Sequence, residues 1–354
     1  MVGERYMQNR RWVVKVNRQA IICFFLLLLL TLLVGANTNN PDLHNYIYNY
    51  SRRTTVVEGS FAFSFVNNLF YRNGITFQVF RLCLYAIGYI ILGIAAKRLV
   101  GDKPILYIFY AIAFMMIDGT QTYNFMGMCL FLLGVSFLIV DDSRWKYVLC
   151  VILASGFHIV FLFYLPFIFI YRGTDRKQLL KLYLIVLGVV ILISTVAGVS
   201  GLATIIQRIL SATGLDTYQS FIQSRTRYGH LYPMMTHLVC CAFGYYYYSK
   251  AQSEQLNNEK LYRVILLLLL YGIFAFPFFR FQLTLGRLTR NLELLTFIAG
   301  INYISEVYSN NKKINNYIFL LGLAIFLGYF IVYSSYMDTI VRPFFEFNWI
   351  FRGN

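Results

Sequence analysis

Three arginines in the C-terminal third of the chain have the spacing of an anion-binding site. Arg280, Arg287 and Arg290 are seven and three residues apart, so on one helix they would share a face, with Glu293 one turn further along. A guanidinium stays charged at physiological pH and donates paired hydrogen bonds, which suits phosphate or diphosphate. Arginines that merely extend from the ends of two membrane spans are the simpler alternative. Ionisable groups at membrane depth, however, usually mark a substrate path.

One histidine and two carboxylates are candidates for proton transfer. His158 lies within an apolar stretch, where a hydrogen-bonded packing role is the alternative to catalysis. Asp42 and Glu58 lie in the first long loop, and either carboxylate is a candidate general base toward a sugar hydroxyl. The alternative for both is a solvent-facing loop charge or an ion pair with Arg52 or Arg53.

The first loop also has aromatic residues at a helical spacing. Asp42, Tyr46 and Tyr50 fall at i, i+4 and i+8, which predicts a short interfacial helix with an aromatic stripe. Such a stripe could stack on sugar rings or simply anchor the loop at the membrane interface. A second polar stretch, residues 118–124, adds hydrogen-bonding groups on the same side, although a polar turn between two spans needs no functional explanation.

The elements that position these groups are predicted to be membrane-spanning helices. The chain is 58% hydrophobic and 13% charged, with a mean hydropathy of +0.60, which indicates an all-α integral membrane protein. We expect a single polytopic bundle over residues 1–354 with about ten to eleven transmembrane segments. The apolar runs that predict them are residues 20–36, 76–96, 104–117, 123–140, 147–170, 179–199, 231–248, 261–279, 291–304 and 314–333.

The basic residues predict how the bundle is oriented. All ten lysines can be placed on one side of a membrane, which is the usual composition of a cytoplasmic face. They are Lys15, Lys97, Lys103, Lys146, Lys177, Lys181, Lys250, Lys260, Lys312 and Lys313. The cations on the opposite loops are then all arginines, which favours binding of phosphate or carboxylate there. They are Arg52, Arg53, Arg72, Arg208, Arg225, Arg227, Arg280, Arg287, Arg290, Arg342 and Arg352.

This orientation requires residues 147–170 to form a hairpin rather than to cross once. Small residues at Ser155 and Gly156, followed by His158, suit an interrupted helix that lines a cavity. The hairpin places the N-terminus inside and the C-terminus outside. Residues 1–19 are then a basic cytoplasmic N-terminus, residues 37–74 and 201–230 are the two outer loops, and residues 280–290 form an outer arginine-bearing segment.

Several other classes are disfavoured by the sequence. The net charge of +16 is explained by cytoplasmic loops and the outer arginines, so we expect no nucleic-acid partner. The six cysteines lie in apolar stretches without a metal-ligand spacing, and no His-Glu-x-x-His motif occurs, so we expect neither a metal nor another cofactor. A cleaved signal peptide competes with an uncleaved first helix at residues 20–36, and the long basic segment before it favours the helix.

Taken in order, these elements resemble the EpsG/Wzy type of bacterial polysaccharide polymerase. The family has an early outer-loop aspartate with tyrosines and an acidic Glu-Pro-Gly-Phe-like element. It then has a Gln-x-Arg element, an Ala-Ser-x-x-His element and a late arginine-bearing segment. Two positions depart from the pattern, since the proline of the acidic element is missing and Tyr123 stands where the Gln-x-Arg arginine belongs. The corresponding residues are Asp42, Tyr46 and Tyr50; Glu58 to Phe61; Gln121 to Tyr123; Ala154 to His158; and Arg287 to Arg290.

The resemblance implies a metal-independent glycosyltransferase in the bacterial inner membrane. It would join undecaprenyl-diphosphate-linked oligosaccharide repeat units into an O-antigen, capsule or exopolysaccharide on the outer face. Possible partners are membrane lipid, a chain-length regulator and a flippase. The implied catalytic residues are Arg287, Arg290, His158 and Glu58, and the implied substrate-binding residues are Arg280, Asp42, Tyr46, Gln121 and Tyr123. The alternatives are a membrane O-acyltransferase with His158 as its base, and a transporter or flippase for lipid-linked sugars.

Overall fold

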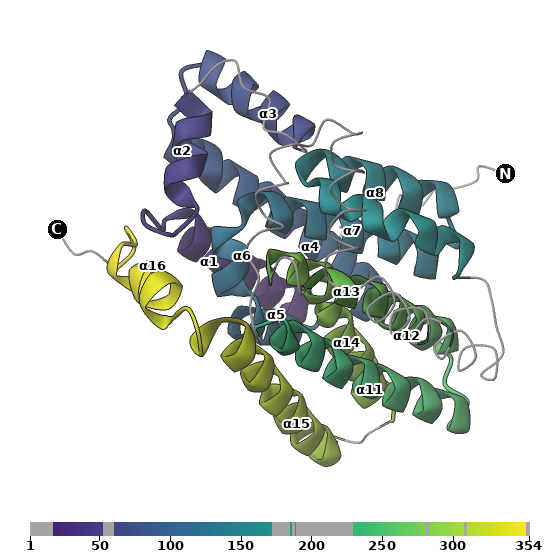
Figure 1. Ribbon diagram of the computed structural model, residues 1–354. Coiled ribbons are helices and arrows are strands. Elements are labelled where there is room, and N and C mark those ends of the chain that lie inside the picture. The colour runs from purple at the N-terminus through teal and green to yellow at the C-terminus, as the bar shows by residue number, and fades with distance from the viewer. Residues whose placement is uncertain are drawn as a thin grey trace, which may run out of the picture.

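The computed structural model describes residues 17–51, 60–171, 185, 188, 229–279, 283–307 and 310–351, and every regular element within these ranges is a helix. The prediction of an all-α fold is therefore confirmed. The α-helices, labelled as in Figure 1, are α1 (Arg18–Gly35), α2 (Leu43–Ser51), α3 (Phe61–Arg72), α4 (Phe77–Val100), α5 (Pro104–Ala113), α6 (Met115–Thr120), α7 (Thr122–Val140), α8 (Arg144–Phe157), α11 (Leu231–Ser253), α12 (Glu259–Gly272), α13 (Phe276–Phe279), α14 (Arg287–Val307), α15 (Asn310–Gly328) and α16 (Arg342–Glu346). The 3-10 helices are Ile159–Phe169, Ile273–Ala275 and Leu283–Gly286, and the π-helices are Tyr329–Tyr333 and Met337–Val341.

The helices expose apolar side chains as membrane-spanning helices do. In the described residues, 5 helical segments are long and apolar enough to cross a bilayer: Arg18–Gly35, Phe77–Val100, Thr122–Val140, Glu259–Phe279 and Lys313–Tyr333. Large apolar residues such as Phe24, Ile90 and Ile318 are 60 to 61% exposed, as expected for side chains that face lipid. The chain is thus a multi-pass membrane protein. The predicted total of ten to eleven segments stays a prediction, because most of residues 172–228 lie outside the described ranges.

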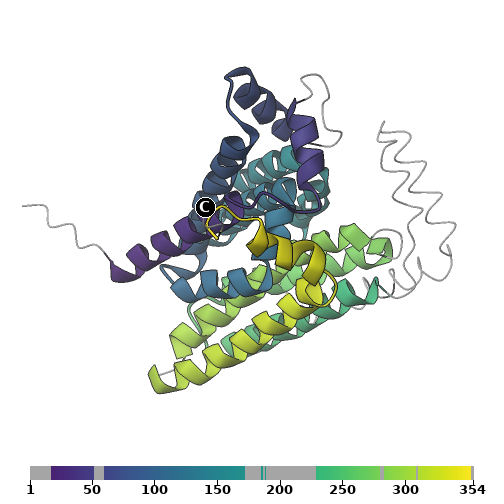
Figure 2. The same cartoon turned by 90° about the vertical axis from the view of Figure 1, so that its left-hand side faces the viewer.

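The bundle consists of two packed layers. Helices α1 to α8, coloured purple to teal, form one layer, and α11 to α16, coloured green to yellow, lie against it in both views (Figures 1 and 2). Helix α14 lies at the junction, because it contacts α4 and α5 of the first layer as well as α11, α12 and α15 of the second. Its side chains can therefore meet groups from both halves of the sequence.

The chain reverses direction at His158, as the hairpin prediction requires. Helix α8 ends at Phe157, and the 3-10 helix Ile159–Phe169 packs back against it. The Tyr147 hydroxyl donates to the Tyr164 carbonyl at 2.7 Å, and the Arg144 Nε donates to the Tyr171 hydroxyl at 3.2 Å. Residues 144 and 171, at the two ends of this segment, are therefore neighbours. The bend at His158 lies at the opposite end of the hairpin.

Close approach of helices around this hairpin depends on small residues. A Cβ at Gly127 of α7 would lie 2.2 Å from the ring of Phe161, and one at Gly134 would lie 2.9 Å from the Cβ of Cys150. Helices in membranes are held together largely by such van der Waals packing, since lipid competes equally for apolar side chains. The two glycines thus fix the hairpin against α7 with His158 at a defined depth.

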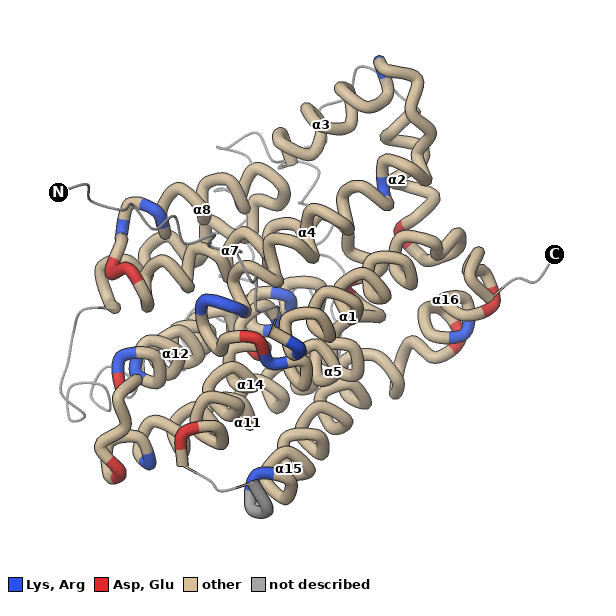
Figure 3. The backbone as a smooth tube through the Cα atoms, turned by 180° about the vertical axis from the view of Figure 1, so that it is seen from behind, with Lys and Arg blue, Asp and Glu red and all other residues tan. Residues whose placement is uncertain are grey.

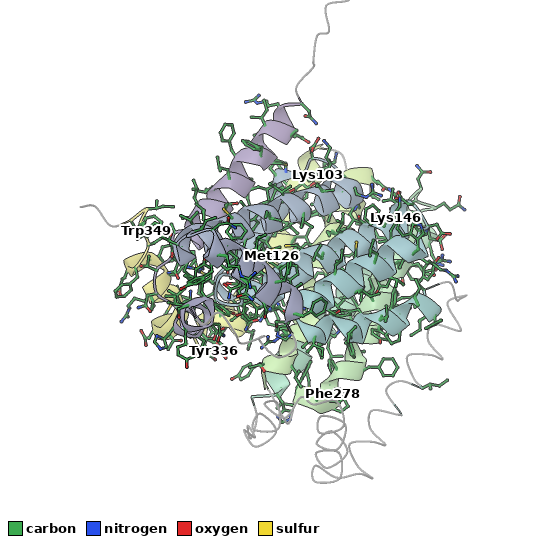
Figure 4. All side chains as sticks on the ribbon, turned by 90° about the horizontal axis from the view of Figure 1, so that it is seen from above. Lys103, Met126, Lys146, Phe278, Tyr336 and Trp349 are labelled. Atoms are coloured by element: carbon green, nitrogen blue, oxygen red, sulfur yellow. The ribbon has the colours of Figure 1, made fainter. Side chains whose placement is uncertain are left out.

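Lysines in the described ranges gather at one end of the bundle. Lys146 pairs with Asp141 at 3.0 Å, and Lys260 pairs with Asp142 at 2.9 Å. Arg98 also pairs with Asp141, which joins the end of α4 to the same cluster. Figure 3 shows charged positions mainly at helix ends, and Figure 4 shows Lys103 and Lys146 on the side opposite Tyr336 and Trp349. This arrangement agrees with the predicted segregation of lysine. That segregation depends on residues 147–170 forming a hairpin rather than crossing once.

The loop over residues 37–74 is largely helical in its described parts. It contains α2 and α3, which the spacing of Asp42, Tyr46 and Tyr50 predicted only in part. The C-terminal segment packs beside it, where Asn37 and Asn348 form an antiparallel bridge. The Asn348 side chain donates to the Leu33 carbonyl at 2.7 Å. The C-terminal end of α1 is therefore held by a residue more than 300 positions away.

The hairpin can be tested by cross-linking its two ends. We expect the Arg144→Cys, Tyr171→Cys double variant to be joined efficiently by a short bis-maleimide, because these side chains touch in the hairpin. A single helical crossing would separate the same positions by about 40 Å. The matched control pairs Arg144→Cys with Phe157→Cys at the bend, about 20 Å away along α8. A short cross-linker cannot join the control positions in either topology, so the control sets the background yield. A 144–171 pair that is joined no better than this control would contradict the hairpin.

Candidate functional site

The site is built around the first two turns of α14. The 3-10 helix Leu283–Gly286 leads directly into α14, whose first and fourth residues are Arg287 and Arg290. The backbone N–H groups of a first turn have no intrahelical partner, and the helix dipole adds positive charge there. Two guanidinium groups on such an N-terminus make it a strong candidate for binding an anion.

The structure corrects one part of the predicted arginine stripe. Arg280, Arg287 and Arg290 were expected on one continuous helix, but α14 begins only at Arg287 and a 3-10 helix precedes it. Arg287 and Arg290 share a face of α14 as predicted, and the position of Arg280 relative to them stays a prediction. Arg280 itself lies outside the described residues, as does Glu58.

Arg290 is largely but not fully buried, and its guanidinium contacts the other layer. Its Nη2 donates to Gln121 Oε1 at 2.6 Å and lies 3.5 Å from Asp118 Oδ1. The side chains of Arg290 and Asp118 are only 11% and 2% exposed. The Tyr110 hydroxyl donates to the second oxygen of Asp118 at 3.1 Å. Sequence reasoning identified Gln121 but missed Asp118, which it treated as part of an ordinary polar turn.

Arg287 meets the hairpin bend. Its Nη1 lies 2.6 Å from His158 Nε2, and its Nε donates to the Thr284 carbonyl at 2.7 Å. A guanidinium only donates hydrogen bonds, so Nε2 of the imidazole is the acceptor in this contact. The structure therefore brings together two predicted site residues that are 129 positions apart in the sequence.

The charge of Arg287 also acts on Asp42, which precedes α2. Burial raises the pKa of the Asp42 carboxyl above its ordinary value, and the nearby positive charge of Arg287 lowers it part of the way back. Asp42 thus lies within electrostatic reach of the same arginine that contacts His158. This proximity supports its place in the site, whereas its role as a substrate ligand stays a prediction.

The predicted tyrosines pack inward rather than presenting an open stripe. Tyr46 and Tyr50 are buried, and the Tyr46 ring lies 4.6 Å from the ring of Tyr123. Tyr123 in turn lies 3.8 Å from the ring of Phe63, while the Tyr50 hydroxyl donates to the Ile75 carbonyl. An exposed stacking surface for sugars is therefore not what this helix forms. The aromatic rings instead attach α2 and α3 to α4 and α7, because burying their large apolar surface stabilises this packing.

Another arginine, which is fully buried, holds the backbone next to the site. Arg81 of α4 is 1% exposed, and its two terminal nitrogens donate to the carbonyls of Asn37 and Gly119. The Tyr85 hydroxyl donates to the same Gly119 carbonyl at 2.9 Å. These bonds hold the C-terminal end of α6, which carries Asp118. The only sign of this role in the sequence was an arginine inside an apolar run.

A cavity of about 160 Å³ lies at the arginines. It is enclosed by α11, by the start of α14 and by the π-helical segment before α16. The lining residues are Ile117, Gln121, Gly229, Tyr232, Pro233, Thr236, Thr284, Gly286, Arg287, Arg290, Glu293, Phe330, Ile331, Ser335 and Tyr336. Apolar residues such as Ile117, Phe330 and Ile331 line it together with the two guanidinium groups.

Further polar contacts hold α14 in place. Asn124 of α7 and Asn291 exchange hydrogen bonds at 2.9 and 3.2 Å, and the Tyr164 hydroxyl donates to the Leu288 carbonyl at 2.5 Å. His237 of α11 contacts the Leu269 carbonyl of α12 at 2.7 Å and is fully buried, so it joins two helices that both contact α14. Among the described residues, no group of three or more metal-ligating side chains is found.

These features define a class: an all-helical, multi-pass membrane protein with two arginines at a cavity, at the end opposite its lysines. The chain belongs to the EpsG family, whose model matches residues 20–348. The resemblance inferred from the motifs is thereby confirmed. In general terms, the protein is a polysaccharide polymerase. Neither curated proteins nor solved structures yielded a match to the chain.

The buried ion pair can be tested by removing its acidic member. We expect Asp118→Ala to lower the free energy of unfolding by about 3 kcal/mol, because it leaves the Arg290 charge buried with less compensation. The matched control is Asp338→Ala, which removes the i, i+4 partner of Arg342 in an ion pair that is 62 and 77% exposed. The control should unfold like the wild-type protein. Equal stability of both variants, measured by denaturation in detergent, would contradict the pairing.

Proposed function

We propose that the protein joins undecaprenyl-diphosphate-linked oligosaccharide repeat units into a surface polysaccharide on the outer face of the bacterial inner membrane. The observation that supports this function most directly is the pair of arginines at the N-terminus of α14, beside a cavity at the end away from the lysines. A positive-inside orientation puts the lysines in the cytoplasm and the cavity outside. The family assignment supplies the general activity, and the arginines suggest the lipid-linked substrate.

The proposed role of Arg287 and Arg290 is to bind the donor diphosphate. When the bond from the anomeric carbon to the diphosphate breaks, negative charge builds up on the departing oxygens. Donors that are already in place stabilise this charge without reorganising, and do so most strongly where water is excluded. Guanidinium groups supply that stabilisation without a metal ion, so metal independence is part of the proposal. The first-turn N–H groups of α14 would add further donors.

The departure at Tyr123 fits this assignment. The family pattern has an arginine at this position, but here the side chain packs between Tyr46 and Phe63 and does not line the cavity. Gln121, from the same element, contacts Arg290 instead. In this chain the cationic contacts to the donor would therefore come from α14, with Gln121 orienting one of them.

His158 is proposed to act through Arg287. Its Nε2 already accepts a hydrogen bond from a guanidinium that cannot give up its proton. Nε2 is therefore already engaged, and a substrate hydroxyl could reach it only by displacing the Arg287 guanidinium. The contact holds the guanidinium at the hairpin bend and facing the cavity, which makes His158 a positioning residue in this arrangement.

The two rival functions predict different arrangements. An O-acyltransferase requires His158 to be accessible as a base and has less need of buried arginines. A flippase requires ionisable groups along the whole membrane path. In the described ranges, the buried charged residues Arg81, Asp118, Glu293 and Arg290 lie toward one end of the bundle. A site for chemistry at one face accounts for this distribution better than a transport path does.

The donor site can be tested in a strain that lacks the gene. We expect Arg287→Ala and Arg290→Ala each to lower the polymerisation rate about 100-fold or more, because each removes a charged donor from the leaving group. A gel would then show a carrier that bears one repeat unit instead of a ladder. The matched control is Arg342→Ala, which removes an exposed cation at the same end. Normal chain length in both site variants would exclude this assignment.

The outcome would also identify the rival functions. An unchanged ladder with altered acetyl content indicates acyl transfer, and loss of all surface glycan indicates transport. Membrane levels of each variant must match those of the wild type for the comparison to hold.

A positioning role for His158 makes a separate prediction. His158→Gln retains an acceptor for Arg287, so we expect it to keep at least about a tenth of the wild-type activity and an unchanged pH profile. His158→Leu removes the acceptor, and its activity should fall to the level of Arg287→Ala. If glutamine is as damaging as leucine and the pH dependence changes, His158 instead exchanges a proton with the substrate.

A further inference from the structure

Glu293 is a buried carboxylate that the proposed donor site does not use. It lies three residues after Arg290 on α14, so the two side chains are neighbours on the helix surface. Glu293 is 1% exposed. The Thr236 hydroxyl of α11 donates to Glu293 Oε1 at 3.0 Å. Among the described residues, Oε2 has no hydrogen-bond partner.

An unpartnered carboxylate oxygen at this depth costs free energy. A buried acceptor without a donor forfeits its hydration, typically by about 1–3 kcal/mol and by more when it is charged. Each such group in a native protein needs an explanation, and for Oε2 the cavity that Glu293 lines offers one. Packing alone would be served better by an apolar side chain of similar size. The geometry thus suggests that Oε2 receives a donor from a ligand.

The cavity provides the place for that ligand. Glu293 lines it together with Arg287 and Arg290, and Thr236 lies on the same wall. Its volume of about 160 Å³ far exceeds the share of a single water molecule, which is about 30 Å³. A group with a hydroxyl, such as the edge of a sugar ring, could therefore reach Oε2 while a diphosphate contacts the arginines.

We propose that Glu293 is a catalytic residue that binds the attacking hydroxyl of the acceptor sugar and takes its proton. This inference rests on the proposed function, because it needs the donor diphosphate at Arg287 and Arg290. The hydroxyl oxygen forms the new bond to the anomeric carbon of the donor. The bond from that carbon to the diphosphate oxygen breaks, and the lipid diphosphate leaves with the electron pair. The hydroxyl proton passes to Oε2.

The other candidate bases are less well placed. His158 Nε2 is engaged by Arg287. Asp42 lies just before α2 and does not line the cavity. Its link to the site is the effect of the Arg287 charge on the pKa of its carboxyl. Glu293 has one oxygen fixed by Thr236 and the other available, which is the arrangement expected of an oriented base.

The rival interpretation is that Glu293 only joins α11 to α14. In that case the hydrogen bond from Thr236 is its whole function. Replacement by glutamine would then preserve that contact, because the amide oxygen also accepts a hydrogen bond. Glu293→Gln therefore separates a structural role from proton transfer while keeping the shape of the side chain.

The test uses the full chain in lipid nanodiscs with a lipid-diphosphate-linked repeat unit as substrate. We expect Glu293→Gln to lower kcat by about 100-fold or more, the usual contribution of a general base. Binding of undecaprenyl diphosphate should stay within about twofold of wild type. The matched control is Glu306→Gln, the same change near the other end of α14, where the carboxylate contacts Asn258. This control should polymerise at the wild-type rate.

A second variant keeps the test decisive if Glu293→Gln fails to fold. Thr236→Val removes the donor to Oε1 but leaves the carboxylate, so the acidic limb of the pH–rate profile should move to higher pH. Added formate should also restore part of the activity of Glu293→Ala, since a small carboxylate fits the cavity. An unmoved profile together with no rescue would overturn the inference.

The two proposals fail in different ways. If Glu293→Gln polymerises normally while Arg290→Ala loses binding of the diphosphate, this inference is wrong and the proposed function stands. Loss of diphosphate binding in Glu293→Gln would also overturn it, by showing that the residue shapes the donor site. If Arg290→Ala binds the diphosphate as wild type does, the proposed function itself fails.

Discussion

The burial of permanently charged guanidinium groups is the constraint on which the rest of the structure depends. Arg290 and Arg81 cannot become neutral in the bundle, and an unpaired charge there would cost several kcal/mol. Arg290 is compensated by Asp118 and Gln121, whereas Arg81 is compensated by two backbone carbonyls. Apart from the Asn37 carbonyl, these partners lie on α6 or at its junction with α7. This short segment therefore sets the position of α14 relative to the N-terminal layer.

The same constraint explains why the two layers meet through polar contacts. Apolar packing provides little preference for one register over another in lipid, because lipid tails satisfy apolar surface equally well. Hydrogen bonds such as Asn124 to Asn291 and Tyr164 to the Leu288 carbonyl define one register. They lie along the first turns of α14, so the helix that holds the arginines is also the helix whose position is most fully specified.

The bundle is asymmetric along its long axis in a way that suits a polymerase acting at one membrane face. Lysines pair with Asp141 and Asp142 in turns at one end, where both partners are partly exposed to water. At the other end the cations are arginines that lie against a cavity. Lysine at the first end needs only hydration, whereas the proposed diphosphate site benefits from a planar, two-point donor.

The sequence by itself determined the class of protein and favoured the hairpin, because these depend on composition and on local patterns, and it predicts the orientation in the membrane. Apolar length, the segregation of lysine and the small residues before His158 are all readable along the chain. It also identified Arg287, Arg290, Gln121 and His158. Only the tertiary structure decided that Arg287 meets His158, that Arg290 meets Asp118 and that Tyr46 packs inward. Those contacts join residues up to 172 positions apart. No local pattern records them, since the partner of a buried charge is selected by how the helices pack and not by spacing along one helix.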